Sequence, residues 1–213
     1  MTTVDGNAGS STISRFSLTV PQNLVLFTFI NGAASAGFLV RTRREGVMTR
    51  AMSSPASTGT LLAGLGIGWF AVALFQSLLI VVIGAVVFGM DWGNPLAAGI
   101  LVVLWALVGA GAGLLVGAIA DDPDRVSAIS PPVGIVLGAL GGCMIPFEVF
   151  SPTMQSIAKA VPHTWALNGW RTLVFDGGGV ADIRGSIAVL SVWVVALLSV
   201  ASVLLRRRLT SGS

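Results

Sequence analysis

Residues 96–120 read LAAGILVVLWALVGAGAGLLVGAIA, an apolar stretch without a single charge that decides the fold class. An α-helix rises about 1.5 Å per residue, so about 20 such residues cross a hydrocarbon core of about 30 Å. Uncharged stretches long enough to cross a bilayer occupy residues 16–40, 51–90, 92–120, 126–147 and 185–205. We therefore expect an all-α fold, a polytopic membrane helix bundle with about five transmembrane helices.

The polar segments set the expected boundaries of this bundle. Residues 1–22 are rich in Ser, Thr and Gly and are expected to form a disordered tail. Residues 23–208 would hold the transmembrane domain, and residues 209–213 a short cytoplasmic tail. Between residues 147 and 180, Pro and Gly interrupt short semi-apolar segments, which predicts re-entrant or interfacial helices on the outer side.

Glycines recur four residues apart along several of the apolar stretches. Such spacing lets helices approach closely in lipid, and it favours a compact bundle or a dimer. The pairs are Gly64/Gly68, Gly109/Gly113, Gly113/Gly117, Gly134/Gly138 and Gly138/Gly142.

Basic residues mark one side of the membrane. Charged residues make up only 10% of the chain, against about 25% in a typical soluble domain. Arginines gather where the apolar stretches end on one side: Arg41, Arg43, Arg44, Arg50, Arg125, Arg206, Arg207 and Arg208. The positive-inside rule makes this side cytoplasmic. The dispersed basic residues argue against a nucleic-acid interface. The spans predict a multi-pass membrane protein, and because the Ala-, Val-, Gly- and Arg-rich composition fits a bacterial genome, we expect it in a bacterial plasma membrane.

The sequence lacks the motifs of an ATPase, a metalloenzyme or a hydrolase. The only lysine, Lys159, follows no phosphate-binding glycine loop, so this chain is expected to bind no ATP by that device. The single histidine, His163, and the single cysteine, Cys143, provide neither a zinc site nor a nucleophile–base pair. The acidic run at residues 121–124 is interpreted as a solvated cytoplasmic turn rather than a metal site. We expect no catalytic residue, no metal and no cofactor in this chain.

A few side chains are candidates for a pathway through the bundle. No charge lies in the middle of a span, which suits an apolar or amphipathic substrate. Candidate wall residues are Phe27, Asn31, Phe75 and Met144, for which ordinary core packing is the alternative interpretation. Glu148, close to the outer face, could cap a re-entrant helix, bind a partner's arginine or line a substrate exit.

Two segments together resemble a known family. Residues 43–55, RREGVMTRAMSSP, directly follow the first span and place Val47, Met48 and Met52 on one helical face. This segment resembles the cytoplasmic coupling helix of type-2 ABC exporter permeases. Residues 141–146, GGCMIP, followed by the PHTWAL stretch at residues 162–167 and by Arg171, resemble the end of the fifth helix of those permeases and their outer re-entrant helices.

The resemblance implies the permease subunit of a bacterial drug- or antibiotic-efflux transporter. Two permease subunits, as a homodimer or a heterodimer, would surround a cavity in the lipid bilayer and export a lipophilic drug, antibiotic or lipid-like molecule. Separate ATP-binding cassette subunits would bind ATP and Mg²⁺ and power transport. The coupling helix would contact that ATPase through Arg43, Arg44, Glu45, Gly46, Val47, Met48, Arg50 and Met52.

Members of this family normally have six spans, and the sequence shows no equivalent of the first one. An alternative interpretation is therefore a truncated membrane scaffold that binds a partner but does not transport. The missing span favours the scaffold, and the retained coupling-helix pattern favours the transporter.

Overall fold

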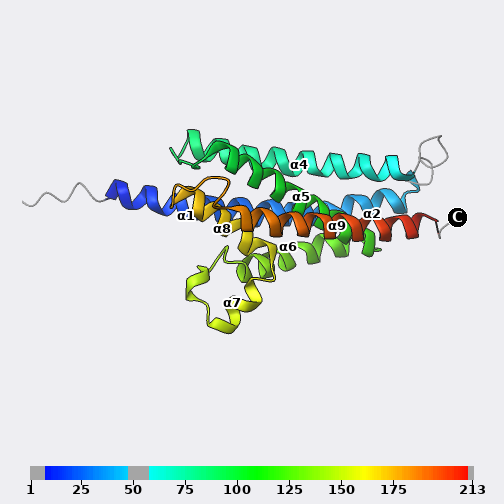
Figure 1. Ribbon diagram of the computed structural model, residues 1–213. Helices are drawn as coiled ribbons and strands as arrows, with labels where there is room; N and C mark the ends of the chain where they lie inside the picture. The colour runs from blue at the N-terminus through cyan, green and yellow to red at the C-terminus, as the bar shows by residue number, and fades with distance from the viewer. Residues whose placement is uncertain (1–7, 48–57, 211–213) are drawn as a thin grey trace, which may run out of the picture.

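The computed structural model describes residues 8–47 and 58–210, with only the backbone at residues 8–18, 58, 62, 209 and 210. The described residues form helices joined by turns and contain no strand, which confirms the predicted all-α class. The helices are α1 (Ala8–Ala34), α2 (Ala36–Arg44), α4 (Thr58–Val86), α5 (Pro95–Ile119), α6 (Pro123–Leu140), η1 (Phe147–Val149), α7 (Pro152–Ala158), α8 (Pro162–Val174) and α9 (Arg184–Thr210) (Figure 1).

Four segments of the described chain are long and apolar enough to cross a membrane. They are Thr19–Arg44, which joins the end of α1 to α2, then Gly59–Val86, Pro95–Ile119 and Arg184–Arg208. The remaining expected span, at residues 126–147, corresponds to α6, which is shorter. It starts at Pro123, carries Asp124 and Arg125 in its first turn, and stops at the Gly141–Gly142 turn, where Gly142 has a φ of 96° that other residues rarely adopt.

The helix α1 begins at Ala8 rather than at residue 23. Much of the segment expected to be a disordered tail is therefore helical in the structure. The Ser- and Thr-rich composition of this segment did not predict a helix, because those residues also favour turns and helix caps. At its other end, α1 is followed by α2 after a break at Ser35, whose hydroxyl donates to the Asn31 carbonyl oxygen at 2.7 Å.

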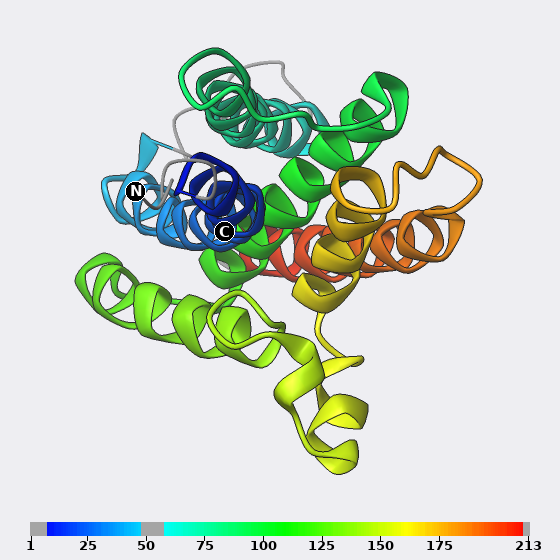
Figure 2. The same cartoon turned by 90° about the vertical axis from the view of Figure 1, so that its left-hand side faces the viewer.

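The helix α5 forms the centre of the bundle. It packs against α9, α1 and α4, and the end-on view in Figure 2 shows it between them. In the most apolar segment of α5, 61% of the residues are buried inside the bundle, compared with 17% in the corresponding segments of α4 and α9. The side chain of Trp105 is fully buried, and its indole N–H donates to the Val25 carbonyl oxygen of α1 at 3.0 Å.

Small residues allow α5 to approach α1 closely. A Cβ atom added at Gly113 would overlap the carbonyl oxygen of Gly32, and one added at Gly32 would lie 2.5 Å from the Gly109 carbonyl oxygen. On the other side of α1, a Cβ at Gly134 of α6 would lie 2.6 Å from Ile30. The predicted close packing of glycine-bearing helices is therefore present at these contacts.

The elements η1, α7 and α8 lie toward the end of the bundle away from α2 and the C-terminus (Figure 1). Only α8 is well buried, against α1, α5 and α9. His163 stands in its first turn with no exposed surface, and its ring packs edge-on against Phe29 and Trp105 at centroid distances of 4.5 and 5.0 Å. This part of the chain corresponds to the segment expected to hold re-entrant or interfacial helices.

Candidate functional site

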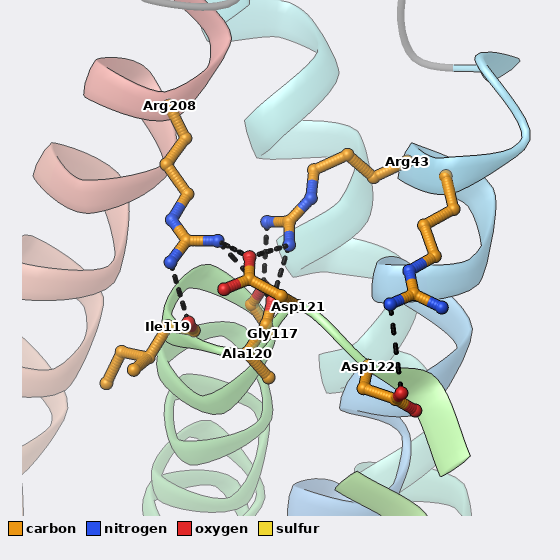
Figure 3. Close-up of polar contacts among 8 residues, drawn as sticks. Arg43, Gly117, Ile119, Ala120, Asp121, Asp122 and Arg208 are labelled. Atoms are coloured by element: carbon orange, nitrogen blue, oxygen red, sulfur yellow. Dashed lines mark hydrogen bonds and ion pairs between the residues drawn. The ribbon is translucent and has the colours of Figure 1, made fainter. Parts of the chain in front are cut away.

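Two arginines from different helices converge on the C-terminal end of α5 (Figure 3). Arg43 of α2 donates through Nη1 to the Gly117 carbonyl oxygen at 3.1 Å and through Nη2 to that of Ala120. Arg208 of α9 donates through Nη2 to the Ile119 carbonyl oxygen at 2.7 Å. The two guanidinium groups therefore connect three helices that are distant in the sequence, α2, α5 and α9, at one point.

The end of a helix needs such partners. The last carbonyl groups of an α-helix have no donor within the helix, and they carry the negative end of its dipole. A guanidinium offers five N–H donors in a planar fork, so one side chain serves two carbonyls and supplies the favourable charge. Arg43 achieves this with a side chain only 18% exposed, which makes it part of the packed structure.

The carboxylate of Asp121 joins both arginines. Its Oδ1 atom lies 3.5 Å from Nη2 of Arg43 and also accepts from Nη1 of Arg208. Because this carboxylate is 77% exposed, water weakens the ion pairs, and the carbonyl contacts hold the arginines more strongly. Asp121 thus neutralises part of the charge that two adjacent cations bring together.

A second ion pair lies beside the first. Nη2 of Arg44 is 3.8 Å from Oδ2 of Asp122, and Oδ1 of Asp122 accepts from the backbone N–H groups of Asp124 and Arg125 at 2.9 and 3.1 Å. Asp122 is therefore the N-cap of α6. The backbone N–H of Arg125 is the main cause that holds the pKa of the Asp122 carboxyl below its ordinary value; the N–H of Asp124 and the charge of Arg44 contribute less. We call Arg43, Arg44, Asp121, Asp122 and Arg208 the arginine cluster.

The residues assigned by resemblance to a coupling helix are only partly described. Arg43 and Arg44 end α2, Glu45 follows as its C-cap, and Gly46 adopts a left-handed φ of 69°. Val47 is the last described residue before the gap, and its side chain is 41% exposed. Met48, Arg50 and Met52 lie outside the described residues.

Arg43 and Arg44 both contact this chain's own carboxylates, so the structure gives them intramolecular partners that the sequence did not indicate. Of the two, Arg44 is the more accessible, with a side chain 55% exposed. Arg43 points inward onto α5 and connects α2 to the end of that helix. From the sequence, Arg208 was interpreted only as a signal of topology, and Asp121 only as part of a solvated turn. Both residues follow the end of an apolar span, and this was the one sequence feature that indicated a contact between them.

The five candidate pathway residues fall into two groups. Phe27 and Asn31 are exposed on α1, four residues apart, and Phe75 is exposed on α4 with 69% of its surface accessible. Met144 and Glu148 instead lie together on the wall of a cavity at the far end of the bundle from the arginine cluster. Glu148 forms an ion pair there with Arg171, a residue of this same chain.

Comparison with known proteins places this architecture in a family. The chain is 29% identical over 166 residues to the linearmycin resistance permease protein LnrN of Bacillus subtilis (strain 168). The match covers 78% of this chain and 43% of the relative, so the chain spans less than half the length of the curated relative that it matches. The family model described as "ABC-2 family transporter protein" matches residues 3–203. This chain, a multi-pass helical membrane protein, therefore belongs to the ABC-2 transporter family.

Proposed function

We propose that this chain is the permease part of an exporter that moves a hydrophobic or amphipathic molecule out across the plasma membrane. A separate ATPase subunit would supply the energy, and a second permease subunit would complete the pathway. The observation that carries the proposal is the convergence of Arg43 and Arg208 on the end of α5.

This convergence supports a coupling role because of where α2 leads. The chain passes from α2 through residues 45–57 to α4, and residues 43–55 are the segment that resembles a coupling helix. A force applied by an ATPase to that segment would reach α2 first. Because Arg43 and Arg208 tie α2 to α5 and α9, the force would move these three helices together rather than bend α2 alone.

The proposal divides the basic residues into two roles. Arg44 and Arg50, with the apolar Val47, Met48 and Met52, would contact the ATPase in a groove with an acidic rim. Arg43 would act behind that contact as a positioning residue. ATP and Mg²⁺ would be bound entirely by the partner subunit.

The name of the relative supports a hydrophobic or amphipathic molecule as the exported substrate. A permease named for resistance to linearmycin suggests an antibiotic or similar molecule as the exported substrate of this chain as well. The uncharged interiors of the spans suit a cargo with a large apolar part.

A docking assay tests this proposal. The double variant Arg44→Glu/Arg50→Glu should abolish co-purification with a candidate ATP-binding subunit, because two charges then oppose an acidic rim. Lys159→Glu, which changes a charge beyond α7 at the other end of the bundle, is the matched control and should leave the complex intact. Equal recovery of the ATPase by both variants would refute the assigned contact. A stable complex that never moves substrate would instead support the scaffold interpretation.

A further inference from the structure

A cavity of about 460 Å³ lies between α1, α8 and the turn that follows α6. We call it the outer cavity, because it is at the opposite end of the bundle from the arginine cluster. Its size falls within the range of small-molecule sites, about 300–1,000 Å³. It is formed within one chain, so it does not depend on how two subunits pack.

Most of the wall is apolar. Leu167 and Trp170 form the buried side, contributed by α8, and Phe147, Met144 and Phe175 are more accessible. Trp170 is 1% exposed and packs edge-on against Trp92 with 4.9 Å between ring centroids, which keeps this wall fixed. A rigid apolar wall of this kind fits the body of a lipophilic molecule.

Five polar side chains line the same cavity: Thr19, Gln22, Glu148, Asn168 and Arg171. Gln22 of α1 spans the cavity's edge, where its amide nitrogen donates to the Gly142 carbonyl oxygen at 3.4 Å. Nη1 of Arg171 pairs with Oε1 of Glu148, and both side chains remain about half exposed, at 50% and 54%. The pair therefore keeps further N–H donors and a second carboxylate oxygen for other partners, and both residues line the cavity.

The pairing decides which polar group fits best. Glu148 and Arg171 sum to no net charge, so a charged ligand group would gain one partner and meet one like charge at short range. A hydroxyl or amide group both donates and accepts, and it could satisfy Arg171, Glu148 and the two side-chain amides at once. The outer cavity is thus matched to an uncharged polar group attached to an apolar body.

We propose that the outer cavity binds an amphipathic molecule whose polar end is uncharged and rich in hydroxyl or amide groups. This names the chemical class of the cargo, and it rests on the proposed function for the step that carries the ligand onward. The Glu148–Arg171 pair is the specificity determinant, because it excludes ligands with a net charge at that end.

Photolabelling of the full chain in nanodiscs tests this assignment. The probe is an alkyl glucoside with a diazirine in its chain, and labelled peptides are mapped by mass spectrometry. Competitors share a dodecyl chain and carry a glucoside, a trimethylammonium or a sulfate head. The glucoside should displace the probe at a concentration at least about tenfold lower than either charged head, because each charged head meets one like charge of the pair.

Variants of the pair should change this preference in opposite directions. Glu148→Gln leaves Arg171 unpaired and should make the sulfate the best competitor, whereas Arg171→Gln should favour the trimethylammonium head. The double variant Glu148→Arg/Arg171→Glu keeps a neutral pair and should keep the preference for the glucoside, which separates specificity from a folding defect. Lys159→Gln, outside the cavity wall, is the control and should behave as the unaltered chain.

Labelling outside the cavity wall, or an unchanged order of competitors in both single variants, would overturn the proposal. The assay contains no ATPase, so it is independent of transport. Selective labelling without ATP-driven export would refute the proposed function but retain the ligand site. Export without selective labelling would refute the site alone.

Discussion

Arg43 and Arg208 both contact the same oxygen atom, Oδ1 of Asp121, although the two arginines belong to helices far apart in the sequence, α2 and α9. Both guanidinium groups also serve the carbonyls that end α5. The contact closes the arginine-rich end of the bundle around its central helix. It connects the C-terminal end of α2 to α5 and α9.

Replacing Arg43 should destabilise the bundle more than replacing Arg41 on the same helix. Arg43→Ala leaves the carbonyls of Gly117 and Ala120 with fewer donors, and we expect a loss of about 1–3 kcal/mol in the free energy of unfolding. Arg41→Ala, on the same helix with an exposed side chain, should change it by less than about 0.5 kcal/mol. Unfolding in a lipid-like detergent, followed by helical circular dichroism, measures both. Equal losses would mean that Arg43 only contributes charge.

The effects of Arg43→Ala and Arg208→Ala should not add. Both side chains contact Asp121 and the Ala120 carbonyl, so each variant changes the surroundings of the other. A double-mutant cycle should give a coupling of at least about 0.5 kcal/mol, as expected for residues in one network. Simple additivity would show that the two arginines act independently.

Asp122 should make the stability of α6 depend on pH in the acidic range. Its pKa is lowered on folding, so its contribution is present above the unfolded value of about 3.9 and is lost as the pH falls through the folded value. Asp122→Ser keeps a capping oxygen but has no titrating group. When the pH is lowered from about 5 to about 2, the unfolding midpoint of the Asp122→Ser variant should therefore fall less than that of the unaltered chain. Parallel acid profiles would exclude this role of the carboxylate.

The close approach of α1 and α5 should make Gly113 intolerant of a side chain. In Gly113→Ala the new methyl group would overlap the Gly32 carbonyl and force the helices apart, at a cost of about 1–3 kcal/mol in the free energy of unfolding. Gly99→Ala is the matched control, because a Cβ there meets open space on the same helix. Thermal unfolding of the two variants tests the contact directly. A Gly113→Ala protein as stable as the control would contradict the described packing.

The sequence predicted the helix class and the spans because uncharged stretches of this length have few alternatives. It could not predict which glycines make contacts. Gly113 meets α1, whereas a Cβ at Gly64 or at Gly68 would find no neighbour within the described structure, although the spacing is the same. Periodicity shows which face a residue occupies, but the partner of that face follows only from tertiary packing.

The candidate sites show the same limit. The resemblance assigned Arg43 to a contact with the ATPase, and for Glu148 the sequence left open a helix cap, a partner's arginine and a substrate exit. The structure gives each a partner in its own chain, Asp121 and Arg171 respectively. These pairs join segments separated by turns and helices, and charge pairing across such distances leaves no local pattern in the sequence.

We propose that the arginine cluster couples an ATPase to the spans, and the ratio of export to ATP hydrolysis tests this coupling. The measurement compares ATP turnover with export of a fluorescent amphipathic substrate by the reconstituted complex, for the unaltered chain, Arg43→Ala and Arg41→Ala. We expect that Arg43→Ala still binds the ATPase and permits ATP hydrolysis, but exports several-fold less substrate per ATP, while Arg41→Ala remains coupled. Unchanged export per ATP in a folded Arg43→Ala complex would contradict this coupling.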